Sequence, residues 1–299
     1  MMSGFELYSS VSHEVAAGVI SRYSTSFGAA VTLLEEPVRS RVRDIYAMVR
    51  VADEVVDGAA PLPAATLRAL LDDYEQAVLT ACERGFSTDL VVHAFAQTAR
   101  ECEIGPDLIA PFFASMRADL EPETHDVTTL ADYVYGSAEV VGLMCLKAFL
   151  VEHPHPQAWE RLSPGARRLG AAFQKVNFLR DLAADENELG RHYLPGTNAQ
   201  HLNEESKKAL IADIYADLDA ADRVISKLPS SSRVAVRAAY LLFRELTAAL
   251  EATPAEEIAR RRIRVSDPRK AALVAQAYID ERVKPRWRRL QATSRRARS

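Results

Sequence analysis

The sequence predicts an all-α protein, and three observations support this fold class. The chain of 299 residues holds only 12 glycines and 14 prolines, fewer than is usual, and it is rich in the helix formers Ala, Leu, Glu and Arg. Alternating runs of Val, Ile and Thr joined by Asn-Gly or Asp-Gly turns, the pattern of β-hairpins, do not occur. Apolar residues instead recur at helical spacing in nearly every long segment.

Prolines and glycines divide the chain into helical segments, and several prolines stand just inside an expected helix start, where a missing N–H costs nothing. No long linker separates the segments, and no repeat of about 20–50 residues occurs. We therefore predict a single domain over residues 1–299, with a core at about 12–290 and a basic tail at 291–299. The expected helices cover about residues 11–22, 37–57, 64–83, 87–103, 106–119, 129–151, 164–188, 204–227, 231–252 and 268–291.

Composition and charge limit the function classes. Apolar residues are 48% and charged residues 26% of the chain, which is typical of a globular protein and excludes a disordered one. The net charge is −4, yet residues 260–299 carry fourteen Lys and Arg against three Asp and Glu. Aromatic residues are not interleaved with these charges, so we expect no nucleic-acid binding. The basic segment is either a solvated surface or a contact to anionic lipid.

The cellular location is inferred from signals that the sequence does not contain. The N-terminus has no basic region followed by an apolar run, so no secretory signal is expected. The longest apolar run, Val140–Val151, is too short to span a bilayer and contains Lys147, which predicts a buried helix. Cys82, Cys102 and Cys145 lack the spacing of a metal site and indicate reduced thiols. We expect a cytoplasmic protein, with peripheral contact to the inner face of the membrane if the basic tail binds lipid.

Two expected helices are apolar on most sides but carry a polar stripe. In residues 44–57 the stripe holds two carboxylates, Asp53 and Asp57, which project from the same face near the C-terminal end of the helix. The helix dipole favours a bound cation at that end. The stripe repeats at steps of three and four, and its members are Tyr46, Arg50, Asp53, Glu54 and Asp57.

Residues 174–185 repeat this arrangement, with Arg180 beside a stripe of Gln174, Asn177, Asp181 and Asp185. A single Asp-x-x-x-Asp pair is usually a solvated face or half of a surface ion pair. Two pairs, each in an apolar helix and each beside an arginine, indicate a different role. Carboxylates that face one cavity repel each other, which raises the pKa of at least one of them unless a cation compensates. Magnesium and a diphosphate fit this pattern, because magnesium takes oxygen ligands and arginine matches phosphate oxygens.

Four blocks of sequence stand out together: Tyr23–Phe27 (YSTSF), Ile45–Asp57, Tyr133–Gly142 and Gln174–Pro195. Together they resemble the squalene/phytoene synthase family of head-to-head prenyl synthases, over roughly residues 12–290. The resemblance implies the isoprenoid synthase fold, a helical bundle around a central cavity. Two positions depart from the pattern, since Glu54 stands where many members have aspartate, and Glu139 stands in a stretch where many members have small residues.

The resemblance also implies roles for individual residues. Catalytic roles are implied for Tyr46 and Arg50, and for Tyr135, which matches the tyrosine proposed to guide proton removal, with Tyr133 as the second candidate. Contacts to the diphosphates or to the second substrate are implied for Ser24, Ser26, Phe27, Gln174, Arg180 and Arg191. Magnesium, for which manganese can substitute, is implied as the cofactor held by Asp53, Asp57, Asn177, Asp181 and Asp185.

The implied activity is that of a prenyltransferase that joins two prenyl diphosphates. The strings YSTSF and VADEVVD are most similar to bacterial phytoene synthases. We therefore expect two geranylgeranyl diphosphates to be joined through prephytoene diphosphate to phytoene, in carotenoid biosynthesis and without NADPH. One alternative is a hopanoid-pathway enzyme that makes presqualene diphosphate or squalene from farnesyl diphosphate. The other is a catalytically inactive helical scaffold, which the two intact aspartate pairs disfavour. The accepted prenyl chain length and the oligomeric state cannot be predicted from the sequence.

Overall fold

The computed structural model describes residues 2–24, 26–57, 61–121, 127–189, 193 and 202–283, without the side chains of 26, 127 and 183–189. Within these residues every regular element is a helix and no strand occurs, which confirms the predicted all-α class. The elements are α1 (Gly4–Tyr23), α2 (Ser26–Val31), α3 (Val38–Val56), α4 (Ala64–Arg84), α5 (Leu90–Glu101), α6 (Pro106–Ala118), α7 (Val127–Val134), the π-helical turn η1 (Tyr135–Glu139), α8 (Val140–Leu150), α9 (Ala158–Leu189), α10 (Glu204–Ile225), α11 (Ser230–Ala252), α12 (Ala255–Ile258), α13 (Asp267–Tyr278) and η2 (Ile279–Val283).

Most helix bounds lie close to the expected ones, and the two largest differences have local causes. Helix α1 begins well before residue 11 because Ser3 and Glu6 form a capping box, in which each side chain accepts a hydrogen bond from the backbone N–H of the other residue. Helix α9 begins at Ala158, so Pro164 lies inside the helix instead of marking its start. The expectation that Pro164 opens the helix is therefore wrong. The proline removes one backbone hydrogen bond from the first turns of α9, which continues past it.

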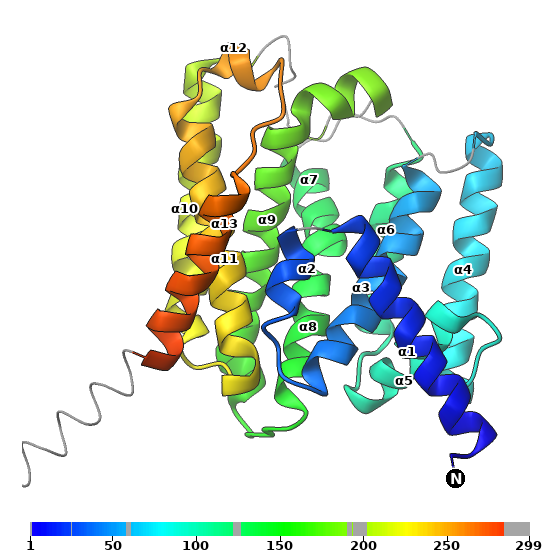
Figure 1. Ribbon diagram of the computed structural model, residues 1–299. Helices are drawn as coiled ribbons and strands as arrows, with labels where there is room; N and C mark the ends of the chain where they lie inside the picture. The colour runs from blue at the N-terminus through cyan, green and yellow to red at the C-terminus, as the bar shows by residue number, and fades with distance from the viewer. Residues whose placement is uncertain are drawn as a thin grey trace, which may run out of the picture.

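Helices α3, α8 and α9 stand at the centre of the bundle (Figure 1). Helices α1, α4, α5 and α6 pack on one side of them, and α10, α11 and α13 pack on the other. Buried apolar side chains form two large clusters, one around Leu179 and Tyr240 and the other around Met48 and Phe112. Helices α3 and α8 contribute to both clusters and so connect the two sides of the bundle.

Close contact between α9 and the η1–α8 segment depends on two glycines. A Cβ atom on Gly142 would lie 2.7 Å from the carbonyl oxygen of Ala166, and one on Gly170 would lie 2.5 Å from that of Ala138. Both distances are shorter than a carbon and an oxygen can approach without a clash. Larger side chains at these positions would push the two backbones apart.

One stretch, Thr128–Leu150, is long and apolar enough to cross a membrane by length and composition alone. Half of its most apolar window is buried inside the fold, where it packs against α9 and α6. Within it, Val140, Met144 and Ala148 are completely buried. The prediction of a buried core helix at Val140–Val151 is confirmed.

Candidate active site

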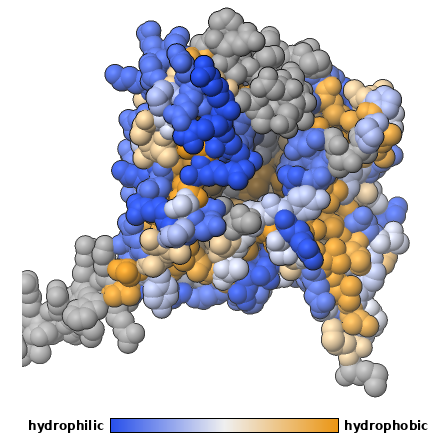
Figure 2. Space-filling view, turned by 45° about the horizontal axis from the view of Figure 1, so that its top comes forward, coloured by the Kyte–Doolittle hydropathy of each residue, from blue (hydrophilic) through white to orange (hydrophobic). Residues whose placement is uncertain are grey.

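A cavity of about 730 Å³ opens between the central helices. Figure 2 looks toward one end of the bundle and shows a hollow with a hydrophobic interior between hydrophilic rims. Most polar lining residues come from the C-terminal parts of α3 and α9, joined by Ser24, Asp119 and Arg262, and most apolar ones come from the remainder of these helices and from α2, α8, α10 and α11. We call the polar end the mouth of the cavity and the opposite end its floor.

The floor is apolar and far from the mouth. Leu162 and Asp181 both line the cavity from α9, and at 1.5 Å per residue they stand about 28 Å apart along the helix. Helix α10 runs antiparallel beside α9, so its C-terminal end lies next to the start of α9 (Figure 1). The floor is closed there by Leu162, Val224, Ile225, Leu228 and Ala235.

Helix α3 brings the first carboxylate pair to the mouth. Asp53 and Asp57 both line the cavity, as the four-residue spacing predicts, and Arg50 lies one turn before them. The Arg50 guanidinium forms an ion pair with Glu54, has Nη1 3.9 Å from Asp53 Oδ2, and lies over the ring of Tyr23 at 4.7 Å. Its buried Nε has no hydrogen-bond acceptor within the described part of the chain. A donor of this kind at the mouth fits an anionic ligand.

The carboxylates at the mouth are electrostatically strained without a cation. Burial and the negative charge of Asp57 raise the pKa of Asp53 to about 7, while Arg50 acts in the opposite direction. Asp119 also lines the cavity, and its charge adds to the upward shift of the Asp53 pKa. The expectation that at least one of the paired aspartates has a raised pKa is therefore met at Asp53.

Helix α9 contributes the second group of predicted residues. Gln174, Asn177, Arg180 and Asp181 all line the cavity. Asp181 accepts hydrogen bonds from Arg180, whose Nε lies 2.9 Å from Asp181 Oδ1. Three predicted contacts lie outside the described side chains and stay predictions, namely Ser26, Asp185 and Arg191.

Helix α2 and the residues before it complete this wall of the mouth. Ser24 lines the cavity, and its Oγ accepts a hydrogen bond from the backbone N–H of Phe27 at 3.1 Å. The ring of Phe27 stacks on that of Tyr46 with 5.8 Å between their centroids. Burial raises the pKa of Tyr46, so its hydroxyl stays protonated and can donate a hydrogen bond into the cavity. The structure thus brings Ser24, Phe27 and Tyr46 together as the sequence predicts.

The two candidate catalytic tyrosines face opposite directions. They are two residues apart on a helical segment, so they cannot share a face. Tyr133 lines the cavity, whereas the ring of Tyr135 lies against the guanidinium of Arg167, 5.0 Å from its centroid, and is not part of the lining. Arg167 also binds Glu139 at 2.6 Å, so this residue too is held outside the cavity. The structure therefore places Tyr133, and not Tyr135, at the site.

Among the described charged and tyrosine side chains that line the cavity, three were not predicted from the sequence: Asp119, Tyr193 and Arg262. Asp119 lies directly after α6, and Tyr193 follows α9. Arg262 lies between α12 and α13 and reaches the mouth, where its Nε stands 2.8 Å from Asp181 Oδ1. Asp181 is thus paired with two arginines, Arg180 and Arg262.

Arg262 changes the interpretation of the basic C-terminal segment. Within residues 260–264 the sequence suggested either a solvated surface or a membrane contact. Arg260 and Arg261 do pair with Glu256 and Glu257 on the surface, but Arg262 turns into the mouth of the cavity. Residues 284–299 lie outside the described part of the chain, so membrane contact through the tail stays a prediction.

The donor atoms at the mouth fit magnesium. Among the described side chains, no three of His, Cys, Asp and Glu lie close enough together to hold a metal ion by themselves. The donors offered by Asp53, Asp57, Asn177 and Asp181 are nevertheless all oxygens, which are the ligands that magnesium takes. Magnesium in enzymes is commonly bound by one or two carboxylates together with phosphates of the substrate. This donor set fits ions that bind together with a diphosphate.

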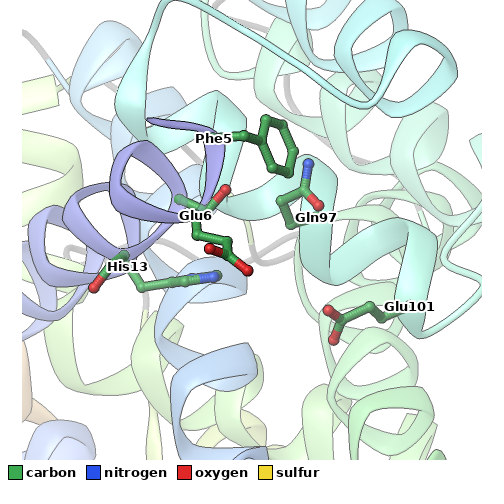
Figure 3. A pocket seen from close by; sticks show the side chains of 7 residues that line it. Phe5, Glu6, His13, Gln97 and Glu101 are labelled. Atoms are coloured by element: carbon green, nitrogen blue, oxygen red, sulfur yellow. The ribbon is translucent and has the colours of Figure 1, made fainter. Parts of the chain in front are cut away.

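A second hollow, of about 400 Å³, lies on the outer face between α1 and α5. Figure 3 shows the ring of His13 and the carboxylates of Glu6 and Glu101 around it. His13 Nδ1 lies 2.9 Å from the completely buried Asp44, to which Thr98 also donates at 2.7 Å. This network connects α1, α3 and α5. None of its three residues lines the large cavity, and the network fixes α1 to the bundle.

The His13–Asp44 pair predicts a pH-dependent contribution to stability. The hydrogen bond to Asp44 raises the pKa of His13, so the charged pair stabilises the fold below about pH 6.5, and this stabilisation is lost as the pH rises through the folded-state pKa. His13→Gln keeps a donor but cannot carry the charge. We expect it to lower the free energy of unfolding by about 1–2 kcal/mol at pH 6 and by much less at pH 9. Thermal melts at both pH values test this, and an equal loss at both would contradict it.

Known proteins resemble this chain along most of its length. The family model described as squalene/phytoene synthase matches residues 20–269. Phytoene synthase 2, chloroplastic, of Solanum lycopersicum is 28% identical over 284 residues, which cover 90% of each chain. The 15-cis-phytoene synthase of Synechococcus elongatus is 28% identical over 268 residues, covering 81% of this chain and 84% of that protein.

Solved structures share the fold. The crystal structure of a dehydrosqualene synthase in complex with ligand superposes with a TM-score of 0.78, covering 92% of this chain and 98% of that chain at 21% sequence identity. At this identity the likeness establishes the helical architecture and not the substrate. The family model, in contrast, spans most of the chain and includes both aspartate pairs. The protein belongs to the squalene/phytoene synthase family.

Proposed function

We propose that the protein joins two molecules of geranylgeranyl diphosphate head to head, through prephytoene diphosphate, to form phytoene. The observation that carries this proposal is a single long cavity with an apolar floor and a mouth that holds carboxylates and three arginines. A prenyl diphosphate has the same division, with a charged head and a long apolar tail. Relatives named phytoene synthases, 28% identical over most of the chain, support the choice of product.

The mouth binds the diphosphates. Arg50, Arg180 and Arg262 supply guanidinium groups that match phosphate oxygens, and Arg50 Nε has no acceptor among the described residues. Asp53, Asp57, Asn177 and Asp181 would hold magnesium, with Asp185 as the predicted further ligand. When bound, magnesium supplies positive charge that neutralises the leaving diphosphate. Asp181 would then exchange its pairing with Arg180 and Arg262 for the cation, which frees both arginines for the diphosphates.

The apolar wall protects the reacting carbon atoms. Ionisation of one allylic diphosphate gives a cation, and the double bond of the second molecule supplies the electron pair for the new carbon–carbon bond. Water would capture such a cation, so the reaction needs a site that excludes water. Side chains such as Phe27, Val141 and Phe173 line the cavity next to the mouth and exclude it there. Conversion of prephytoene diphosphate to phytoene ends with loss of a proton, so the proposed reaction uses no NADPH.

Removing divalent metal is expected to stop the reaction. In excess chelator the purified protein should release no diphosphate from geranylgeranyl diphosphate, because the carboxylates at the mouth then repel the substrate. Magnesium, or manganese, should restore turnover. Diphosphate release and hydrocarbon formation measured over a metal titration test the proposal. Turnover that continues in excess chelator would contradict the assignment of the aspartates as metal ligands.

A further inference from the structure

A π-helical turn interrupts the wall of the cavity between α7 and α8. It covers Tyr135–Glu139, and the backbone N–H of Val140 closes it by donating to the carbonyl oxygen of Tyr135. Single π-helical turns inside α-helices are uncommon, and they often occur at functional sites. The lining residue Tyr133 lies just before the turn and the lining residue Ser137 lies within it, so the geometry of the turn decides where both side chains point.

The turn aligns Tyr133 with the lining face of α8. An α-helix advances by about 100° per residue, so in an unbroken α-helix Tyr133 and Val141 would point about 80° apart. A π-helix contains about 4.4 residues per turn and advances by about 82° per residue. With the five residues Tyr135–Glu139 in this geometry, the same two side chains point within about 10° of each other. Both line the cavity, as this alignment requires.

Helices α6 and α9 enclose the backbone of the turn. On one side, a Cβ atom on Gly136 would overlap the backbone of α6, and Ser115 Oγ donates to the carbonyl oxygen of Tyr133 at 3.1 Å. On the other side, a Cβ atom on Gly170 of α9 would lie 3.1 Å from the Cα atom of Glu139. The turn therefore fits closely between two helices, and a change in its geometry must be absorbed by the segments that flank it.

One arginine on α9 contacts both ends of the turn from outside the cavity. Arg167 Nε lies 2.6 Å from Glu139 Oε2, and the Arg167 guanidinium lies 5.0 Å from the centroid of the Tyr135 ring. Tyr135 is the first residue of the turn and Glu139 is the last. The Arg167 side chain is half-exposed, but that of Glu139 is only 14% exposed, so this ion pair is better shielded from water than a pair on an open surface. None of the three residues is part of the cavity lining.

We propose that Tyr135, Glu139 and Arg167 form a clamp that keeps the turn π-helical. The clamp thereby holds Tyr133 and Ser137 in the cavity wall, and its effect on turnover rests on the proposed function. The three clamp residues are positioning residues, because they act on the substrate only through the side chains that the turn orients. Without the clamp the turn can open toward α-helical geometry. Since α8 is packed closely against α9, the resulting rotation falls on the segment before the turn and moves Tyr133 away from the cavity.

Arg167→Ala tests the clamp, because it removes both contacts at once. Hydrogen–deuterium exchange of the backbone amides in residues 133–142 should become about 10-fold faster, while exchange in α3 should not change. With geranylgeranyl diphosphate and magnesium, kcat for hydrocarbon formation should fall about 10-fold, and KM should change by less than about twofold. This difference between kcat and KM is expected because the groups that bind the diphosphates at the mouth stay in place.

Arg168→Ala is the matched control. Arg168 is the next residue of α9, but it binds Asp217 of α10 at 2.9 Å, and Asp217 keeps Lys175 as a partner at 2.7 Å. Neither amide exchange at 133–142 nor kcat should change in this variant. Glu139→Ala removes only the ion pair and should have a smaller effect than Arg167→Ala. The double variant should be no slower than Arg167→Ala alone, since the two changes remove the same contact.

The inference is wrong if Arg167→Ala folds, as judged by its thermal melt, and leaves amide exchange at 133–142 unchanged. It is also wrong if exchange becomes faster without a loss of kcat, because the turn then does not position the cavity wall. If Arg167→Ala does not fold, Arg167→Lys is measured instead; it keeps the charge, loses the planar group over Tyr135, and should show both changes to a smaller extent. If the unmodified protein forms no hydrocarbon from geranylgeranyl diphosphate, the proposed function fails, and amide exchange alone decides whether the clamp holds the turn.

Discussion

Replacing Asp53 with asparagine is expected to lower turnover at least about 100-fold, since the cavity mouth loses a carboxylate that holds the cation against the leaving group. The same change should stabilise the metal-free protein above pH 7. The pKa of Asp53 is raised to about 7 in the fold, against about 3.9 in an unfolded chain, so ionisation of this carboxyl destabilises the protein progressively as the pH rises through this window. Asparagine cannot ionise and avoids this cost.

The expected gain in stability is about 1–2 kcal/mol at pH 8, because partial solvent exposure of Asp53 screens the charge. Below pH 4 the two proteins should differ little, since the carboxyl is then protonated in both states. Thermal melts without metal at pH 4 and pH 8, together with a turnover assay, measure both effects. Asp72→Asn is the matched control: Asp72 pairs with Arg117 at 2.7 Å on the surface, and its loss should change neither quantity much. A destabilised Asp53→Asn protein that keeps its activity would contradict the account.

Filling the cavity floor is expected to change the preferred substrate. If the diphosphate is held at the mouth, the last isoprene unit of geranylgeranyl diphosphate reaches the floor, where Ala235 lines the wall. Ala235→Phe removes space there and should lower kcat/KM for geranylgeranyl diphosphate about 10- to 100-fold relative to farnesyl diphosphate. Steady-state kinetics with each substrate give this ratio, and retained conversion of farnesyl diphosphate serves as the internal control for folding. An unchanged ratio would show that the prenyl tail does not reach this end of the cavity.

The fold class and the carboxylate-bearing helices could be predicted because their signals are local. Apolar residues at helical spacing predict the helices, and a polar stripe inside an apolar helix predicts which side chains face a cavity. For this reason Arg50, Asp53 and Asp57 on α3, and Asn177 and Asp181 on α9, were found without knowledge of how the helices pack. The start of α9 was misplaced because proline is a strong helix-start signal, and the fold tolerates Pro164 within the first turns.

Helical spacing decides between the two tyrosines once the cavity-lining face of α8 is known. Tyr133 continues a stripe of lining residues at steps of four, namely Ser137, Val141, Cys145 and Phe149, and Ala138, Gly142 and Leu146 line the cavity beside this stripe. The π-helical turn at Tyr135–Glu139 fits this wide spacing, since its turns contain more residues than those of an α-helix. A residue two positions after Tyr133 lies on the opposite side, where the structure has Tyr135 against Arg167.

No local sequence pattern of this kind marks Asp119 or Arg262 as cavity residues. Asp119 stands alone after a helix, and its partners Tyr133 and Tyr193 are 14 and 74 residues away in the sequence. Arg262 lies in a run of arginines that looks uniform, and only the fold shows that it pairs with Asp181 at the mouth, beside the buried Ile263. Both residues reach the site through tertiary packing, which a single sequence does not encode as a motif.

The identity of the product distinguishes phytoene synthesis from its two alternatives. The purified protein is incubated with magnesium and equal amounts of farnesyl and geranylgeranyl diphosphates, without NADPH, and the extracted products are identified by mass spectrometry. We expect phytoene, a hydrocarbon of forty carbons. Conversion of farnesyl diphosphate alone, to presqualene diphosphate or another product of thirty carbons, would contradict it in favour of the hopanoid-pathway alternative. A folded protein that converts neither substrate would contradict it in favour of an inactive scaffold.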